Sequence, residues 1–246
     1  MFAAAVIAAV LAGSAATTAA QDRVRLAISA GEQASTAKIK QTETFQQYSE
    51  QGSLTLDRTI PKRPFYDGGV AIRVAGGLYL GTTVSLFKSA GNGTVTAQVP
   101  HPFFFNQRRT TTGTVAGIDR KETAVHIQAL WTTRAAGGIE FTTFGGPSIF
   151  QIEQGHVSKL NLTLADEVYP YDTLPVFPGA IAAVVKDKVT GYNAGVDMTW
   201  RLAKHFGLGA LIRYSHGQKN VTPPGEQAVK IETGGLHAGG GLRAIF

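Results

Sequence analysis

Apolar residues alternate with polar or small residues in segments of roughly ten residues, and this pattern constrains the fold more than any other feature of the chain. The last segment is the clearest example: Leu236, Leu242 and Phe246 share one face, and His237 and Arg243 share the other. Successive side chains of a β-strand point to opposite faces. The pattern therefore predicts a strand with one apolar and one polar side.

Eight segments show this alternation, and the connections between them are alternately short and long. Membrane barrels have short periplasmic turns and long outer loops, so we expect an all-β, eight-stranded antiparallel transmembrane β-barrel with short periplasmic turns and long extracellular loops. Pro147 follows two glycines and predicts a bulge. The expected strands are 24–31, 70–74, 78–87, 124–131, 139–152, 192–201, 206–215 and 236–246, and the expected long loops are 35–64, 90–119, 153–189 and 217–231.

The polarity of the two faces favours a membrane barrel over a soluble one. A soluble lipocalin-type barrel has an apolar interior, but here the face that is not apolar carries Gly, Ser and charged residues. Trp131 and Trp200 lie beside short turns, and Tyr192 and Tyr214 lie toward the long loops, as expected for aromatic girdles at the two membrane interfaces. A spanning sheet must be closed, because hydrocarbon cannot satisfy an open edge.

The N-terminal segment is a separate unit. Residues 3–12 are almost wholly apolar, and Thr18-Ala19-Ala20 precede Gln21. This pattern predicts a signal peptide over 1–20, although its basic n-region is missing, and a barrel domain over 21–246. A buried N-terminal helix is the alternative. We expect export through the periplasm to the bacterial outer membrane.

Charge and cysteine content exclude several functions. The formal net charge is +6, but the basic residues are dispersed, which argues against a nucleic-acid partner. The sequence has no cysteine, so disulfides, Cys-based metal sites and thiol nucleophiles are excluded. No motif indicates a cofactor or a metal, and we expect a monomer.

The C-terminal run Gly234-Gly235-Leu236-His237-Ala238-Gly239-Gly240-Gly241-Leu242-Arg243-Ala244-Ile245-Phe246 resembles the last strand of small bacterial outer-membrane β-barrels. Phe144-Gly145-Gly146-Pro147-Ser148 is similar to an internal strand of such proteins. The likeness covers 23–246 and is closest to the transmembrane domain of outer membrane protein A, with no periplasmic domain following. It implies that Phe246 is an assembly signal for the barrel-assembly machinery, and that membrane lipid and lipopolysaccharide are partners.

Polar residues on the inward face form the first candidate site. An eight-stranded barrel is just wide enough for side chains to fill it, and Asp197 and Arg213, on neighbouring strands, are expected to pair. A polar plug is one interpretation, a narrow pore for small solutes or ions is another, and a catalytic or metal trio of His126, His237 and Asp197 is a third. The expected lumen network is Arg73, His126, Asp197, Arg213, His237 and Arg243.

The second candidate site lies in the second long loop, where Phe103, Phe104 and Phe105 precede Arg108 and Arg109. Exposed contiguous aromatics mark interaction sites, so this segment is a candidate docking patch whose arginines meet lipopolysaccharide. In the alternative, the phenylalanines pack into a cap over the lumen with aromatic residues of other loops. The candidates for that cap are Phe45, Tyr48, Phe65, Tyr66, Tyr169 and Tyr171.

These features predict a structural or surface-interaction protein without catalytic activity. A narrow passive pore is the alternative. A lipid A-modifying enzyme is a lesser one, because Ser215 and His216 are adjacent in a strand and point to opposite faces.

Overall fold

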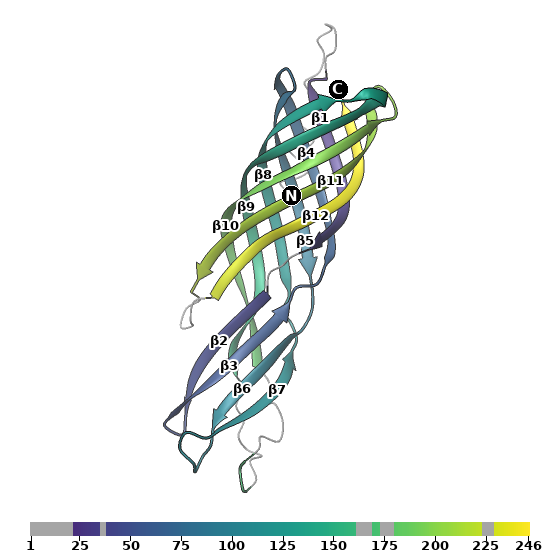
Figure 1. Ribbon diagram of the computed structural model, residues 1–246. Helices are drawn as coiled ribbons and strands as arrows, with labels where there is room; N and C mark the ends of the chain where they lie inside the picture. The colour runs from purple at the N-terminus through teal and green to yellow at the C-terminus, as the bar shows by residue number, and fades with distance from the viewer. Residues whose placement is uncertain (1–21, 35–37, 161–168, 173–179, 223–228) are drawn as a thin grey trace.

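The computed structural model describes residues 22–34, 38–160, 169–172, 180–222 and 229–246. The segment 1–20, expected to be a signal peptide, lies outside these ranges. Eight strands form a closed antiparallel barrel in the ring order β1-β12-β11-β10-β9-β8-β5-β4 (Figure 1). The barrel strands are β1 (Val24–Ala34), β4 (Arg63–Ala75), β5 (Leu78–Ser89), β8 (Arg120–Arg134), β9 (Ile139–Leu160), β10 (Ala180–Arg201), β11 (Phe206–Val221) and β12 (Val229–Ile245).

The register confirms the expected division into two faces. Arg213 is opposite His237 in the β11–β12 pair, and both side chains are buried in the lumen. The seam between β1 and β12 closes the ring, with Ser29 opposite Gly241. Glycine is required there, because a Cβ atom on Gly241 would lie 1.8 Å from the carbonyl oxygen of Ile28.

The outer wall of the barrel is an apolar belt. Ile28, Ile212 and Leu242 are each more than 60% exposed, at 69%, 61% and 64%, although all three are large aliphatic residues. Such a surface needs a lipid solvent, so the soluble lipocalin-type alternative is wrong. No helix in the described ranges is both long enough and apolar enough to cross a membrane.

Aromatic side chains mark both edges of the belt, as the sequence predicted. Trp131 and Trp200 are exposed near the short turns, and Tyr192 and Tyr214 are exposed toward the long connections. Amphipathic aromatic rings favour the level of the lipid headgroups. The two pairs therefore place the membrane between them.

Two of the expected long loops are folded. The segments 35–64 and 90–119 each contain a hairpin, and the two hairpins form a second antiparallel sheet in the order β2-β3-β6-β7, beyond the long-connection end of the barrel (Figure 1). The expectation of loops there is wrong: Val95, Ala97 and Val99 of β6 alternate with threonine and glutamine, which is also a strand pattern, although it is shorter than that of the barrel strands. The strands are β2 (Lys38–Gln47), β3 (Glu50–Thr59), β6 (Gly93–Pro100) and β7 (Arg108–Val115).

A hydrophobic core joins this second sheet to the extended ends of β9 and β10. Leu56 of β3 and Val95 of β6 are buried in it beside Val157 of β9. The side-chain amide of Gln41 donates to the carbonyl oxygen of Val157 (2.7 Å) and accepts from its N–H (3.1 Å). It thus satisfies the backbone of β9 at a point beyond the first residue of β8, Arg120. We call this unit the extracellular module.

The other two long loops are shorter than expected, because the strands continue beyond the belt. β9 and β10 have 22 residues each, and their pairing extends as far as Leu160 of β9 opposite Ala180 of β10. β11 reaches Val221, and β12 begins at Val229.

The expected bulge at Pro147 is absent. Pro147 is opposite Tyr192, with no register shift at this point of the β9–β10 pair. The side-chain amide of Asn193 donates to the carbonyl oxygen of Gly146 (3.0 Å) and to Ser148 Oγ (2.9 Å). These bonds support the strand where the proline supplies no N–H.

Candidate functional site in the lumen and at the extracellular tip

A charged cluster fills the lumen at the short-turn end. Glu140, nearly fully buried, accepts from Arg25 (2.6 Å), Arg134 (2.9 Å) and Arg201 (2.7 Å). Asp22 pairs with Arg134 and Arg201 from the other side. Three arginines and two carboxylates from four different segments thus stabilise one another.

The mid-lumen ion pairs differ from the sequence prediction. Arg213 pairs with Asp67 of β4 (Nη1–Oδ2 2.9 Å), and Asp197 pairs with Arg243 of β12 (Nε–Oδ1 3.2 Å). The expected Asp197–Arg213 pair is wrong. Asp197 is opposite Leu211 in the β10–β11 register, so Arg213 lies further along the barrel than Asp197 and reaches across the lumen.

Hydrogen bonds extend the Arg213–Asp67 pair into a buried network. Arg213 donates to Ser85 Oγ (2.8 Å) and to His237 Nδ1 (3.1 Å), and Ser85 in turn donates to Asp67. His237 Nδ1 is therefore an acceptor, and its Nε2–H donates to Ser215 Oγ (3.1 Å). In chain order the network is Asp67, Ser85, His126, Ser148, Asn193, Arg213, Ser215 and His237.

This protonation pattern does not provide a nucleophile beside a base at Ser215. His237 donates to Ser215 instead of accepting from it, and a guanidinium, not a carboxylate, contacts its other ring nitrogen. His216 faces outward, stacked on Tyr214, as the alternation predicted. His126 accepts from Ser148 (2.7 Å), but both side chains are buried in the filled lumen. No cluster of three metal-ligating side chains occurs among the described residues.

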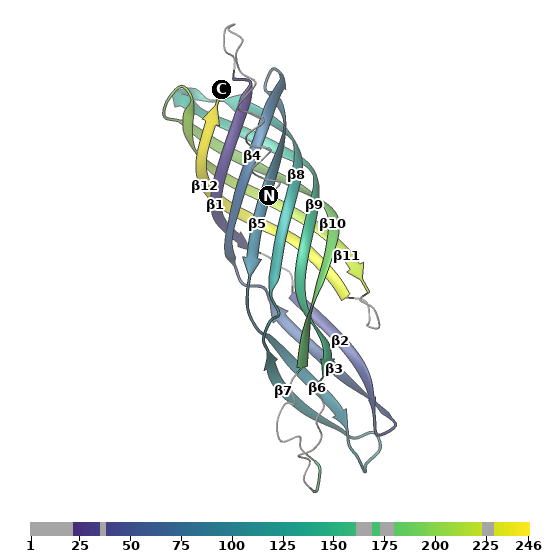
Figure 2. The same ribbon diagram turned by 180° about the vertical axis from the view of Figure 1, so that it is seen from behind.

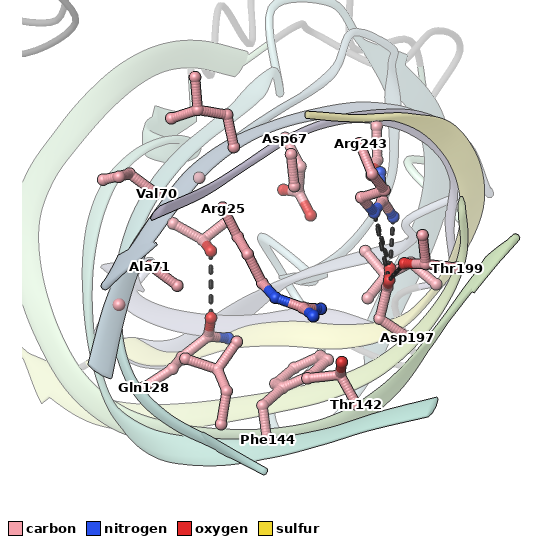
Figure 3. Close-up of a pocket in the computed structure, with 18 of the residues that line it drawn as sticks. Arg25, Asp67, Val70, Ala71, Gln128, Thr142, Phe144, Asp197, Thr199 and Arg243 are labelled. Carbon is pink, nitrogen blue, oxygen red and sulfur yellow. Dashed lines mark hydrogen bonds and ion pairs between the residues drawn. The ribbon is translucent and has the colours of Figure 1, made fainter. Parts of the chain in front are cut away.

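A small cavity lies between the mid-lumen network and the short-turn cluster. Its volume is about 90 Å³, room for roughly three water molecules. Figure 3 shows Arg25, Gln128 and the Asp197–Arg243 pair projecting into it from different sides of the ring.

Apolar residues close the lumen on the other side of the network. Phe150, Ile152 and Ile231 pack there with Ala124 and Val189. Buried Arg120 lies nearby and binds Glu122 (3.0 Å) and Gln154 (2.8 Å). The described residues therefore place ion pairs in the short-turn half of the lumen and an apolar plug toward the long connections, with the small cavity among the ion pairs.

Three phenylalanines protrude at the tip of the extracellular module, in the turn between β6 and β7. Phe103, Phe104 and Phe105 are 70%, 57% and 77% exposed. The turn is held in shape, because Nδ1 of buried His101 accepts from the N–H groups of Phe103 and Phe104 (3.1 Å each). Asn106, which has a positive φ of 60°, donates its N–H to Glu50 (2.7 Å).

The two arginines of this segment have different environments. Arg108 is exposed, whereas Arg109 is 2% exposed and donates to the carbonyl oxygens of Pro100 (3.0 Å) and Tyr171 (3.3 Å). Arg109 is thus part of the turn's support, and its expected contact with an external ligand is wrong. Neighbouring residues of a strand point to opposite faces, and this explains why Arg108 is exposed and Arg109 is buried in β7. The expectation of a loop here did not distinguish the two arginines.

The expected cap over the lumen does not form. Tyr171 contacts Phe103 (ring centroids 5.3 Å apart), but Phe65 lies inside the lumen against His237, and Phe45 packs on the module's core. Tyr48, Tyr66 and Tyr169 are 39%, 62% and 81% exposed.

Two other predicted residues lie at the short-turn end. Arg73, expected in the lumen network, donates to the carbonyl oxygen of Gly76 (2.6 Å). Phe246 lies at the rim: its N–H donates to Val24 (2.9 Å), and its ring stacks on His205 at 5.5 Å.

The closed ring of eight strands, the polar interior and the apolar belt define the class: a transmembrane β-barrel of the bacterial outer-membrane type. No protein-family model matches the sequence, and neither does any curated protein. Among solved structures, the chain is similar to the outer membrane protein OprG of Pseudomonas aeruginosa (9% identity, 92% of this chain and 97% of that chain, TM-score 0.48). It is also similar to the N-terminal barrel domain of OprF from the same organism (10%, 92% and 98%, TM-score 0.41) and to the outer membrane protease OmpT of Escherichia coli (10%, 94% and 99%, TM-score 0.43).

Proposed function

We propose that this protein is a closed, non-catalytic anchor in the outer membrane that displays the extracellular module for contact with a partner. The proposal is supported by the contrast between the barrel lumen and the extracellular module. Ion pairs and an apolar plug occupy most of the lumen and leave a small cavity, while the module has its own core and exposes three phenylalanines on a supported turn.

Exposure of these phenylalanines is costly in water, and this favours a contact role. Burial of one phenylalanine is worth roughly 1.5–3 kcal/mol relative to exposure. The His101 and Glu50 hydrogen bonds fix the turn's backbone, so the side chains stay available to a partner. Arg108 adds an exposed positive charge beside them.

A tip variant tests the contact role. Cells that display the parent chain are compared with cells that display Phe103→Ser, Phe104→Ser and Phe105→Ser together, in attachment to one another and to a phosphatidylcholine-coated surface. We expect a severalfold loss of attachment in the variant. The control carries Thr110→Ser, Thr112→Ser and Thr114→Ser, three exposed positions on β7. Equal attachment by the parent and the tip variant, in both assays, would contradict the contact role.

The pore alternative rests on the small cavity between the mid-lumen network and the short-turn cluster. Planar-bilayer recording of the refolded chain separates it from the closed anchor. We expect no steady conductance, because Arg213 and the apolar plug are buried side chains that occupy the described lumen. Steady conductance that changes in Arg213→Ala would favour the pore.

A further inference from the structure

A hollow lies on the outer wall of the barrel over β8, β9 and β10. These three strands run side by side (Figure 2). Two cross-strand rows of outward-facing residues border it. The row nearer the extracellular module is Lys121, Glu153 and Lys186, and the row nearer the membrane is Thr123, Gln151 and Lys188. We call the site bordered by these rows the wall site; its lining also includes Asp187 and buried Ile152.

The wall site lies at the outer edge of the apolar belt. Toward the membrane, the same outward rows continue with Val125 on β8 and Ile149 on β9, and with Thr190 and then Tyr192 on β10. Ile149 is 43% exposed and Tyr192 is 53% exposed. Because interfacial tyrosines mark the headgroup level, the wall site faces the headgroups of the outer leaflet.

The wall site carries a net positive charge, because its three lysines outnumber its two carboxylates, Glu153 and Asp187, and Asp187 is paired with Lys219 (2.8 Å). Glu153 lies between Lys121 (3.5 Å) and Lys186 (2.8 Å), and Lys188 makes no ion pair within the described ranges. Lys88, opposite Lys121 on β5, adds a fourth ammonium beside the site. Exposed pairs such as those of Glu153 contribute little stability, so the lysines are free to turn toward another anion.

We propose that the wall site binds the phosphorylated sugar headgroup of an outer-leaflet glycolipid. The ammonium groups of the three lysines would contact phosphate, with additional donors from the Gln151 amide and the Thr123 hydroxyl. The carboxylate of Glu153 would accept a hydrogen bond from a hydroxyl group of the sugar. The acyl chains would continue down the wall over Val125 and Ile149.

This location differs from the arginines that the sequence suggested for lipopolysaccharide. Arg109 is buried, and Arg108 begins β7 at the far tip of the module. The eight residues of β7 span roughly 25 Å at about 3.3 Å per residue. The wall site, in contrast, adjoins the belt itself.

The test measures binding of purified lipids to the full mature chain refolded in neutral detergent, by native mass spectrometry. The probes are diphosphorylated lipid A and phosphatidylglycerol. The site variant carries Lys121→Gln, Lys186→Gln and Lys188→Gln. A charge-matched control carries Lys40→Gln, Lys62→Gln and Lys204→Gln, three exposed lysines elsewhere. Heat-modifiable gel migration verifies that each variant is folded.

We expect the parent and the control to bind lipid A, and the site variant to bind it at least about tenfold more weakly. Equal affinity in the parent and site variant would overturn the wall site, as would an equal loss in the control or no binding by the parent. Phosphatidylglycerol that binds the wall site as tightly as lipid A would overturn the glycolipid assignment in favour of a plain anionic lipid.

Discussion

Arg213 of β11 and Asp67 of β4 form an ion pair across the lumen, between strands that lie three places apart in the ring. Their side chains are 1% and 4% exposed. Each charge is therefore withdrawn from water and depends on the other and on Ser85 for compensation.

Asp67→Asn should destabilise the barrel by about 3–5 kcal/mol, because it leaves a buried guanidinium without its counter-charge. Urea unfolding of the refolded chain in phosphatidylcholine vesicles measures this loss. Asp197→Asn is the matched control; it removes a carboxylate beside the cavity that is 15% exposed, and we expect a smaller loss. Adding Arg213→Gln to Asp67→Asn should recover part of the stability. A single variant as stable as the parent would show that the pair does not compensate the guanidinium.

Leu56→Ala should unfold the extracellular module locally while the barrel stays intact. Leu56 is 1% exposed in the module's core, and truncation of a buried leucine costs about 2–5 kcal/mol. Protease treatment of intact cells should cleave the module of the variant faster, with heat-modifiable migration unchanged. Leu202→Ala, at an exposed short-turn position, is the control. Unchanged protease resistance would mean that the module does not depend on this core.

Most of the barrel could be predicted from the sequence, because lipid outside and polar residues inside impose strict alternation. The rows that end in Trp131, Trp200 and Phe246 have the orientation that this pattern predicts. The extracellular module was not predicted, because its strands are short and lie in the segments expected to be loops, although Val95, Ala97 and Val99 of β6 alternate and are fully buried. Alternation assigns a residue to a face, but it does not identify its partner.

The lumen contacts show this limit. Arg213 and Asp197 were correctly assigned to the inward face, yet their partners are Asp67 and Arg243. Contacts across a barrel depend on strand tilt and stagger, which set the height of each residue. Those quantities arise from the closed ring and are not encoded in the periodicity of one strand.

Acid should weaken the short-turn end of the barrel through Asp22. Burial raises the pKa of Asp22, but the hydrogen bond from Arg201 and the charges of Arg201, Arg134 and Arg25 lower it more, so the net pKa lies below its ordinary value. The stabilisation is therefore present above the unfolded-state pKa and is lost as the pH falls through the lower folded-state pKa. Urea unfolding measured at pH 7 and at a series of lower pH values should show that the free energy of unfolding falls less in Asp22→Asn than in the parent. Identical pH profiles would exclude this contribution.

Phe246→Ala should lower the amount of protein at the cell surface severalfold without lowering the stability of the refolded barrel by more than about 1 kcal/mol. The ring is 49% exposed, whereas the backbone bonds of Phe246 to Val24 (2.8 and 2.9 Å) close the barrel and survive the substitution. Surface labelling measures assembly, and urea unfolding of the refolded chain measures stability. Deletion of Phe246 removes the backbone bonds as well and should reduce both quantities. Phe206→Ala is the control, since Phe206 is 60% exposed at the same rim but is not the terminal residue. Equal surface levels for Phe246→Ala and the parent would show that the terminal ring is not read during assembly.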